Sequence, residues 1–421
     1  MNSTTESSED LISESSDENT SQIDNLDLNC KIINNYNIIY ELGRGSYSIV
    51  WLAYNINTQK FYALKVQNPS EYDEGYDEIK FVKKLPENPN VFNNIYESFT
   101  EIVDDNKYLC SVWNLHSTNI DTLIRKGDYR NGFSLDNVKY IMNQLIKAIK
   151  ILHKNYKVFH GDIKTDNILV KGINERDQYV INEYIKDNFN EKYTIHKKEF
   201  WVNKGNKLDN ICKMNKKDKN NIRKQIHQDM TNKIIQDDSL KLSINSKYLE
   251  KIEISLADFG TYCSEDNYYD ESFGTRYYQA PEIILMGKCS YPVDIWALGC
   301  TFFELLTGQI LFDPDKDSKY SRDYYHLCLI NETCGNFPPS FLKKTKFYKD
   351  FFDSKFNIIN YIYNSNNKLN ECIKKIEGID DSDKKTITRL LSQMLQIDPT
   401  KRINIIDLSK ESFFNDYCIK Y

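Results

Sequence analysis

The sequence predicts an α+β protein built from two lobes, a small one based on an antiparallel sheet and a larger one that is mostly helical. Two observations carry this prediction. Short apolar runs separated by turns fill residues 36–115, as is typical of strands, with one helical segment among them. From Leu135 to His153 apolar residues recur every three or four positions, which indicates an amphipathic helix, and most of the later chain is also helix-like.

The small lobe is expected over residues 36–116 and the large lobe over 117–415, together forming one domain at 36–415. The predicted elements of the small lobe are strands at 38–42, 49–54, 61–66, 91–99 and 108–115 and a helix at 77–85. The apolar positions of the first long helix of the large lobe are Val138, Ile141, Met142, Leu145, Ile146, Ile149 and Leu152.

The composition is that of a soluble globular protein, with 421 residues, 40% of them hydrophobic and 28% charged. A net charge of -6 argues against a dedicated nucleic-acid binder. No apolar run is long enough to cross a bilayer, and the start of the chain lacks the features of a signal peptide. Ten scattered cysteines without a C-x-x-C pair favour reduced thiols over disulfides or zinc. We therefore expect an intracellular monomer, cytoplasmic with the nucleus as a second location, and no contact with membrane or nucleic acid.

An acidic tail is predicted at residues 1–30, where Ser and Thr cluster with eight carboxylates and no Lys or Arg. Such a segment buries too little apolar surface to offset the entropy of ordering it, so we expect disorder. Its Ser residues beside carboxylates suit an acid-directed kinase, and a solvated tail without a specific role fits equally well.

An insertion of about 172–250 separates two predicted strands of the large lobe. Between residues 192 and 224 it holds eleven Lys and Arg residues against three acidic ones. One interpretation is a localisation signal or a docking platform. The other is a mobile, solvated linker with a short helix.

The segment that most restricts the reactions this protein could catalyse is HGDIKTDN at residues 160–167. It places three functional groups in one short loop before a strand. Asp162 can accept a hydroxyl proton, Lys164 can neutralise charge on a transferred phosphate, and Asn167 can hold a metal ion. These are the groups needed to move a phosphoryl group.

Residues 43–50, GRGSYSIV, form a glycine-rich turn between two predicted strands, which suits a backbone that closes over phosphates. On its own this pattern is also typical of an ordinary turn. The next strand carries Lys65, which can reach the phosphates, and Glu78 on the following helix can hold that Lys in place. The predicted nucleotide-binding residues here are Leu42, Gly43, Arg44, Gly45, Ser46, Tyr47, Ser48, Val50, Ala63, Lys65 and Glu78.

Past the insertion, the sequence Ala257-Asp258-Phe259-Gly260 offers Asp258 as a magnesium ligand beside Asn167, since Mg²⁺ prefers oxygen donors. An activation segment runs from Asp258 to Glu282 and contains Thr275, which with Lys164 is typical of enzymes that modify Ser or Thr. Three packing residues are expected to stack in a column, namely Val82, His160 and Phe259. Two further residues are expected to be structural: Asp294 as an acceptor for the 160–167 backbone and Arg402 as the partner of Glu282.

With these motifs in order, the chain resembles the eukaryotic-type Ser/Thr protein kinases, and most closely the SR-protein kinase branch of the CMGC group. The narrower likeness rests on the sequence YDEIK at 76–80, the long spacer, and LFDP at 311–314 leading to YSRDYYH at 320–326. The resemblance implies a bilobal protein kinase fold and transfer of the γ-phosphoryl group of ATP, with Mg²⁺, to protein Ser or Thr. The abundance of Asn, Ile, Lys and Tyr is typical of an AT-rich genome such as that of a giant virus.

The resemblance also implies finer assignments. Trp113 would guard the pocket behind the adenine, or simply be core, and the backbones of Asn114, Leu115 and His116 would bond the base. Gly161 replaces the Arg that usually precedes the catalytic Asp, which predicts activity without phosphorylation of the activation segment.

The branch acts on arginine/serine-rich segments, and an acidic groove for such substrates would use Asp313, Asp315, Asp317 and Asp323. Nearby basic residues dilute that charge, and Gln279 and Ala280 depart from the branch's pattern, so other Ser/Thr substrates, acidic or proline-directed, stay open. A pseudokinase scaffold and a small-molecule kinase are the remaining alternatives. The full set of catalytic residues argues against the first, and the segment 274–282 argues against the second.

Overall fold

The computed structural model describes Leu28 and residues 32–45, 47–87, 90–103, 106–186, 189–235, 251–264, 272–315, 319–361 and 368–415. The chain divides into two compact units. The first comprises Met1–Leu85, Asn94–Leu115 and Ile173–Ile244, and the second comprises Pro86–Asn93, His116–Gly172 and Asn245–Tyr421. Apart from Leu28, the predicted acidic tail lies outside the described residues.

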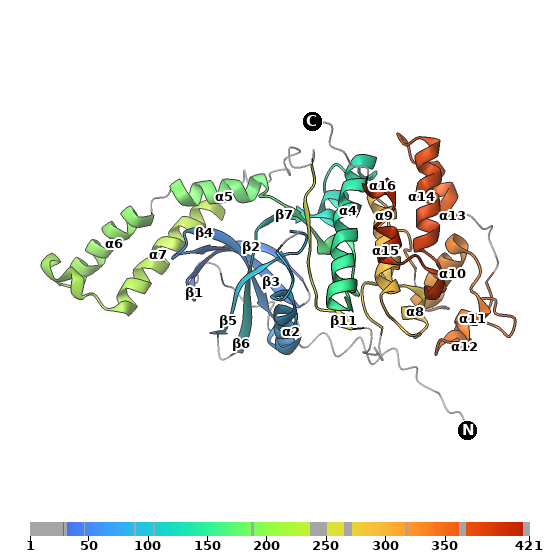
Figure 1. The fold of residues 1–421 in the computed structure, drawn as a ribbon. Coiled ribbons are helices and arrows are strands. Elements are labelled where there is room, and N and C mark those ends of the chain that lie inside the picture. Colours follow the sequence, from blue (N-terminus) through green and yellow to red (C-terminus); the bar gives the residue numbers. More distant parts are fainter. Residues whose placement is uncertain are drawn as a thin grey trace, which may run out of the picture. The chain divides into compact units, whose positions relative to one another are not determined.

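The first unit is built on a six-stranded antiparallel sheet with the strand order β1-β2-β3-β4-β6-β5 (Figure 1). The strands are β1 (Ile32–Ile33), β2 (Tyr36–Arg44), β3 (Ser48–Asn55), β4 (Lys60–Gln67), β5 (Ile95–Val103) and β6 (Asn106–Trp113). The predicted small-lobe sheet is therefore confirmed. Its one main helix, α2 (Tyr72–Val82), follows the short 3-10 turn η1 (Pro69–Glu71) and begins five residues before the predicted start at 77.

One predicted strand begins later than expected. The apolar run at 91–99 suggested a strand from Val91, but β5 starts at Ile95. Val91 and Phe92 instead belong to the second unit, where the amide of Leu256 donates to the Val91 carbonyl at 2.8 Å and Phe92 bridges to Leu256. Both side chains are buried there, which explains why they are apolar without being part of the sheet.

Both faces of this sheet are covered. Ile38 and Ile39 are neighbours on β2, so their side chains point to opposite faces, yet both are fully buried. Ile38 lies in a core cluster with Leu28, Trp51 and other strand residues, whereas Ile39 lies in a separate cluster. A continuous apolar run along a strand is expected where neither face meets water.

The insertion supplies the cover for the second face. It folds as α5 (Glu175–Lys186), α6 (Phe189–Asn203), the 3-10 turn η4 (Leu208–Lys213) and α7 (Lys216–Ile235), rather than as a linker with one short helix (Figure 1). The buried side chains that it contributes to the cluster around Ile39, Tyr40 and Leu52 are Val180, Tyr184, Trp201, Met214, Ile222, Ile226 and Met230.

Hydrogen bonds between the insertion and β2 accompany this apolar packing. Asn37 on β2 donates from Nδ2 to the Tyr184 hydroxyl at 2.8 Å, and the Tyr184 hydroxyl lies 2.6 Å from His227 Nδ1 on α7. The Tyr40 hydroxyl bonds the buried carboxylate of Asp177 on α5. Because buried polar groups are costly when left unpaired, these contacts specify one seating of the insertion on the sheet.

The second unit contains two small sheets. One has the order β10-β9-β7, from β7 (His116–Asn119), β9 (Ile168–Lys171) and β10 (Ile254–Leu256). The other pairs β8 (Val158–Phe159) with β11 (Cys263–Ser264).

Helices make up the rest of the second unit, which confirms the predicted helical lobe. They are α3 (Ile120–Arg125), α4 (Leu135–Ile151), α8 (Pro281–Ile284), α9 (Pro292–Thr307), α10 (Arg322–Cys334), α11 (Pro339–Leu342), α12 (Tyr348–Phe351), α13 (Lys368–Lys374), α14 (Asp381–Met394), α15 (Ile405–Leu408) and α16 (Ser412–Asn415).

Two of these helices organise the core of that unit. The predicted helix at 135–153 is present as α4, is capped by Ser134, and continues as a π-helical turn, η2 (Leu152–Tyr156). Nearly every residue of α9 is buried, as expected for a helix that is apolar on all sides. Within the described ranges, no helix combines the length and the apolar character that crossing a bilayer requires.

The packing of the insertion can be tested with a matched pair of substitutions. Ile226→Ala removes a side chain on α7 that is 1% exposed, and the cavity should lower the free energy of unfolding by about 2–4 kcal/mol. Ile195→Ala, on α6 where the side chain is 48% exposed, should change it by less than about 0.5 kcal/mol. Urea unfolding of the full chain measures both. Equal effects would show that α7 does not contribute to the core of this unit.

Candidate functional site

The predicted phosphate-covering turn joins β2 to β3 in the first unit. Gly43 pairs with Val50 and Arg44 with Ile49, and the amide of Gly45 donates to the Ser48 carbonyl at 2.9 Å. A Cβ atom at Gly43 would meet no atom of the chain within 4 Å. Packing within the protein therefore does not require glycine here, which leaves room for a ligand over the backbone. Ser46 lies outside the described residues, and the predicted neighbours Leu42 and Tyr47 flank this turn.

The predicted ion pair of Lys65 and Glu78 is present in the same unit. Lys65 lies on β4 opposite Val50 of β3, and its Nζ is 2.9 Å from Glu78 Oε2 on α2. The Glu78 side chain is buried, while that of Lys65 is 19% exposed. The buried carboxylate holds the ammonium in one place and leaves part of it accessible. Ala63 lies two residues earlier on the same strand, opposite Trp113 of β6.

The four residues predicted at the nucleotide hinge are placed by two different units. Trp113 ends β6, is buried, and donates from Nε1 to the Ser111 hydroxyl at 2.8 Å. Asn114 accepts a hydrogen bond from the Tyr96 hydroxyl at 2.7 Å. Leu115 closes the first unit, and His116 begins β7 of the second.

The loop at 160–167 is held by a buried carboxylate of α9. Asp294 accepts the backbone amides of His160 at 2.8 Å and Gly161 at 2.9 Å, as predicted from the sequence, and its Oδ2 lies 2.8 Å from His153 Nε2. Burial by itself raises the pKa of Asp294, but these hydrogen bonds and the His153 ring outweigh burial and keep the pKa below its ordinary value. The anchor is therefore an ionised carboxylate inside the core.

Gly161 occupies a conformation that few other residues adopt. Its φ is +84°, and a Cβ atom there would lie 2.8 Å from the Thr261 carbonyl oxygen. The Thr261 hydroxyl donates back to the His160 carbonyl at 3.0 Å. A larger residue before Asp162 would therefore require this segment to move.

Asp162 is surrounded by groups that favour its charged form. Lys164 Nζ lies 2.8 Å from its Oδ2, and the amide of Thr275 donates to its Oδ1 at 2.7 Å. Burial raises the pKa of Asp162, but the Lys164 ammonium and the hydrogen bonds from Lys164 and Thr275 more than offset burial, so the pKa is lowered overall. Lys164 also donates to the Thr275 hydroxyl at 2.6 Å. The site thus presents an ionised carboxylate and a cation side by side, beside a segment of the activation loop.

The two predicted metal ligands are brought together by one ladder of strands. Asn167 precedes β9 and Asp258 follows β10, and these strands pair with Ile168 opposite Leu256. The amide of Ala257 donates to the Asn167 carbonyl at 3.0 Å. Two residues that are 91 positions apart in the chain are therefore brought near each other within the unit.

Both side chains offer oxygen atoms that suit Mg²⁺. Asn167 donates from Nδ2 to the Asp162 carbonyl at 2.8 Å, which leaves its Oδ1 as the outward acceptor. Asp258 has a positive φ of +63°, is exposed, and makes no ion pair or hydrogen bond with the described residues. Among the described residues, no group of three or more His, Cys, Asp or Glu side chains is placed to hold a metal.

The activation segment is held by a single amide side chain. Gln279 donates from Nε2 to the carbonyl of Phe273 and the hydroxyl of Ser272, both at 3.0 Å, and to the Gly274 carbonyl at 3.3 Å. Gly274 has a φ of +74°, and a Cβ atom there would lie 2.6 Å from the Gly161 carbonyl oxygen. Groups of the protein itself therefore fix this part of the segment against the catalytic loop. Residues 265–271 lie outside the described residues.

The predicted structural residues of this unit are in place. Arg402 and Glu282 form a buried bidentate pair with distances of 2.7 and 3.0 Å, and the guanidinium also lies over the Trp296 ring. His160 and Phe259 have ring centroids 4.9 Å apart. Phe92 extends this stack at 6.0 Å from Phe259, while the third predicted member, Val82, belongs to the first unit.

One cluster of positioning residues was not predicted from the sequence. Glu304 of α9 accepts a hydrogen bond from Tyr278 at 2.5 Å, is paired with Arg125 of α3, and lies 3.5 Å from the Thr165 hydroxyl. Burial raises the pKa of Glu304 despite these partners. The available signal was a lone carboxylate in the apolar run FFELL, at a position where a buried charge needs partners.

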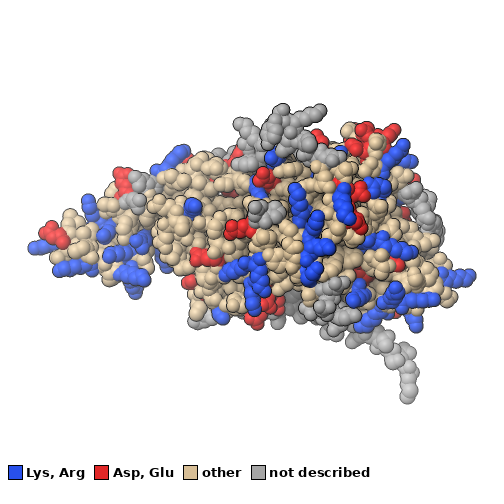
Figure 2. Space-filling model, viewed as in Figure 1, with Lys and Arg blue, Asp and Glu red and all other residues tan. Residues whose placement is uncertain are grey.

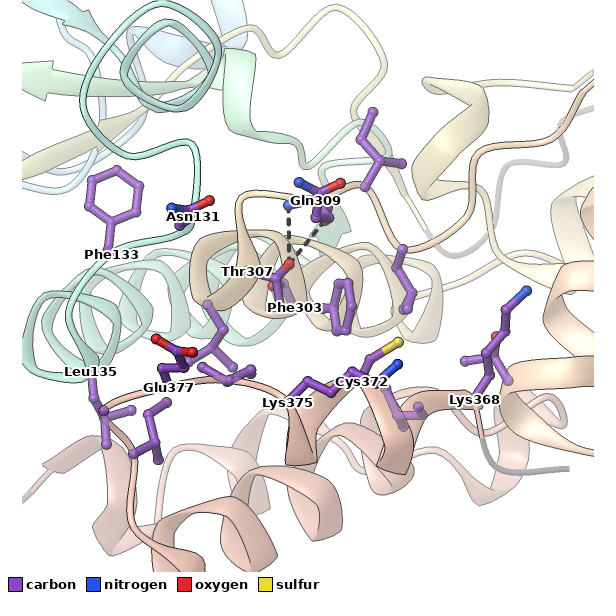
Figure 3. Close-up of a pocket in the computed structure, with 18 of the residues that line it drawn as sticks. Asn131, Phe133, Leu135, Phe303, Thr307, Gln309, Lys368, Cys372, Lys375 and Glu377 are labelled. Atoms are coloured by element: carbon purple, nitrogen blue, oxygen red, sulfur yellow. Dashed lines mark hydrogen bonds between the residues drawn. The ribbon is translucent and has the colours of Figure 1, made fainter.

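A groove of about 960 Å³ also lies in the second unit, away from this loop (Figure 3). Side chains from the ends of α4 and α9, from α10, and from α13 with the residues after it line the groove. Its labelled side chains include Phe303, Cys372 and Glu377. Among the described residues that line it, none belongs to the predicted catalytic or metal-binding set.

Comparisons with known proteins agree with this geometry. The protein kinase domain family matches residues 36–186 and 226–414. A protein of Acanthamoeba polyphaga mimivirus named as a serine/threonine-protein kinase, L205, is 26% identical over 473 aligned residues, covering 90% of this chain and 87% of the relative. The serine/threonine-protein kinase SRPK of Physarum polycephalum is 28% identical, covering 91% of this chain and 86% of the relative.

A third relative, protein kinase dsk1 of Schizosaccharomyces pombe, is 25% identical, covering 88% of this chain and 78% of the relative. The family match covers most of the chain, and the first two relatives, both named as serine/threonine-protein kinases, align over 87% and 86% of their own length. The chain therefore belongs to the protein kinase family, as a serine/threonine-protein kinase similar to the SR-protein kinases.

Proposed function

We propose that this kinase transfers the γ-phosphoryl group of Mg-ATP to Ser or Thr hydroxyls of protein substrates. The observation that carries the proposal is the contact of Asp162 with Lys164 at 2.8 Å, in a loop that Thr275 closes from the activation segment. A carboxylate that stays ionised can orient an acceptor hydroxyl and take its proton. The adjacent ammonium of Lys164 can neutralise negative charge on the phosphoryl group in the transition state of the transfer.

The remaining residues bind and orient the nucleotide in this proposal. Asn167 and Asp258 would hold Mg²⁺ through their free oxygens, and Lys65, held by Glu78, would bond the phosphates. The turn at 43–50 would cover the phosphates, and the backbone of 114–116 would bond the adenine. When bound, Mg-ATP would supply the phosphoryl group, and its metal ion would supply positive charge that offsets the charge of the phosphates. The role of these residues is to position the nucleotide. Positioning accounts for most of the acceleration of phosphoryl transfer in enzymes of this kind.

The role of Asp162 is tested by comparing two isosteric substitutions in the same loop. Asp162→Asn should lower turnover by about 10²- to 10⁴-fold, because the amide can neither accept the proton nor pair with Lys164. Asp166→Asn, whose side chain is exposed, is the matched control and should keep turnover within about threefold of the unmodified chain. Transfer of labelled phosphate from ATP to a Ser peptide measures both. Equal turnover in the two variants, or no transfer by the unmodified chain, would favour a pseudokinase scaffold.

We further propose that the substrates are Ser residues in arginine/serine-rich segments. Support comes from the likeness to the kinase named SRPK and from the exposed carboxylates of Asp313 and Asp315. Asp323, predicted to contribute to the same groove, is paired instead with Arg276, so its charge is not available to a substrate. Asp317 lies outside the described residues.

Substrate class is tested by offering arginine/serine-rich, proline-directed and acidic Ser peptides in parallel. The basic peptide should be labelled fastest, and its advantage should shrink in the double variant Asp313→Asn, Asp315→Asn as the attraction between charges is removed. The pair Asp350→Asn, Asp381→Asn changes the charge equally and serves as the control. Faster labelling of the acidic peptide would reject this substrate class and leave the kinase assignment intact.

Activity without phosphorylation of the activation segment is the third part of the proposal. Gly161 has no side chain to receive a phosphate, and Gln279 makes the contacts that fix the segment at 272–274. Groups of the protein also supply the contact of this segment with the catalytic loop, in which the Thr275 amide donates to Asp162.

This proposal predicts that replacing Ser264 by Ala and Tyr268 and Tyr269 by Phe leaves turnover within about threefold of the unmodified chain. Thr261 and Ser272 are kept because the Thr261 hydroxyl bonds the His160 carbonyl and the Ser272 hydroxyl accepts a hydrogen bond from Gln279. Gln279→Ala should lower turnover by about tenfold or more, since three acceptors lose their donor. Phosphatase-treated protein is assayed with ATP and the best peptide. Loss of activity in the triple variant to the level of Asp162→Ala would contradict the proposal.

A further inference from the structure

A basic surface lies on α6, η4 and α7, which we call the basic hairpin. Figure 2 shows its Lys and Arg side chains gathered at the left of the view, over these elements. Between residues 192 and 224, eleven basic residues face three acidic ones, a surplus of eight positive charges in a protein whose net charge is -6. The proposed kinase chemistry does not use this charge.

Part of that charge is used within the hairpin itself. Lys204 is 2.8 Å from Asp218, and Arg223 lies over the Tyr193 ring at 5.4 Å. In the described part of the chain, six exposed lysines of the hairpin make no ion pair: Lys198, Lys207, Lys213, Lys216, Lys217 and Lys224. Between residues 192 and 224, Glu199 and Asp209 are also exposed, so most but not all of the exposed charge is positive. Like charges on a folded helical surface repel one another, so an anion that binds among these lysines relieves the repulsion.

Four of the six lysines lie where α6 connects to α7. Lys207 and Lys213 bracket η4, and Lys216 and Lys217 open the 20-residue helix α7, whose N-terminus adds positive partial charge. Val202 and Leu208 at the same connection are each 49% exposed. A surface of lysines with exposed aliphatic side chains fits an acidic peptide that also carries apolar residues.

The chain contains such a peptide. Residues 1–27 hold eight acidic residues and no Lys or Arg, and among the acidic residues stand Leu11, Ile12, Ile23 and Leu26. Eight negative charges in the tail match the surplus of eight positive charges in the hairpin. A nucleic acid would match the charge but not the aliphatic side chains, and the negative charge of the whole chain opposes it.

The attachment point of the tail makes the contact possible within one molecule. Leu28 is fully buried in the sheet core with Ile38 and Trp51, so the tail leaves from the unit that also carries the hairpin. A coil of about 27 residues has an end-to-end distance of about 30 Å, comparable with the length of α7. Linkage of this kind gives an effective concentration of about a millimolar, so individually weak ion pairs suffice.

We infer that the basic hairpin is a binding surface for an acidic, Ser-rich peptide, and that residues 1–27 of the same chain occupy it. The insertion is then a folded receptor for the amino-terminal tail, held on the small-lobe sheet. The contact is electrostatic and weakens with salt.

The inference is tested with a Glu-specific protease that cuts the tail at Glu6, Glu9, Glu14 and Glu18 of the full chain. The hairpin variant carries Lys→Gln at 207, 213, 216 and 217. The control carries Lys→Gln at 343, 344, 346 and 349, exposed lysines of the second unit. Neither set changes a cleavage site. Cleavage in the tail should be about fivefold faster in the hairpin variant than in the control, because cleavage follows the population of unbound tail.

Varying the salt concentration tests whether the contact is electrostatic, and varying the protein concentration tests whether it forms within one chain. Raising NaCl from about 0.05 M to about 0.5 M should speed tail cleavage in the unmodified chain and erase the difference between variants. The rate should not depend on protein concentration, whereas slower cleavage at higher concentration would show that a second copy supplies the tail and would overturn binding within one chain. Equal rates in the hairpin variant and the control would overturn the inference entirely.

A reciprocal experiment changes the tail and measures protease cleavage of the basic hairpin. Replacing the eight tail carboxylates by amides should speed tryptic cleavage within 204–217, and trypsin cannot cut residues 1–27 because they contain no Lys or Arg. If the tail change has no effect while a labelled single-stranded oligonucleotide binds the unmodified chain and not the hairpin variant, the surface is a nucleic-acid site and the inference is wrong.

Discussion

The catalytic loop depends on one buried carboxylate, that of Asp294. It accepts the amides of His160 and Gly161 directly before Asp162, and it is itself held by His153. Without that acceptor the two amides would lose their hydrogen bonds, and each unpaired amide would cost about 1–3 kcal/mol of folding free energy. The loop would then no longer be attached to the core at this point. Since α9 is buried along nearly its whole length, packing fixes the position of Asp294. The hydrogen bonds of Asp294 in turn fix the loop that carries Asp162.

From that anchor the loop reaches the other parts of its site through short polar contacts. Lys164 and Thr275 meet at Asp162, and Asn167 is tied to Asp258 through the strands that follow and precede them. Each contact joins segments separated by dozens of residues. The arrangement favours the ionised form of Asp162, as the proposed base requires. Among the described residues no group bonds the carboxylate of Asp258 or the side-chain oxygen of Asn167, as the proposed metal ligands require.

The insertion changes how the small lobe is understood. The second face of its sheet would expose Ile39, Tyr40 and Leu52 if the insertion were a solvated linker, and α5 and α7 bury them instead. The same segment then carries its lysines outward on a rigid framework. Folding thus turns a run of charge into a surface with defined geometry, which a linker of the same composition would not have.

The sequence by itself determined the two-lobed α+β architecture, most strands of the small-lobe sheet, and the motifs that carry the chemistry. Those signals are local, because a strand period, a glycine turn or the residues 160–167 can each be read within a few positions. The Lys65–Glu78 and Glu282–Arg402 pairs were also predictable, since family motifs specify both partners.

Only the tertiary structure decided where the insertion packs, why Val91 and Phe92 are apolar, and that Tyr278 and Arg125 meet Glu304. These contacts join residues far apart in the chain, and each side chain alone is compatible with either burial or exposure. The choice depends on whether a partner arrives to fill the space and satisfy the polar groups. That is a property of the packed molecule, which no single stretch of sequence contains.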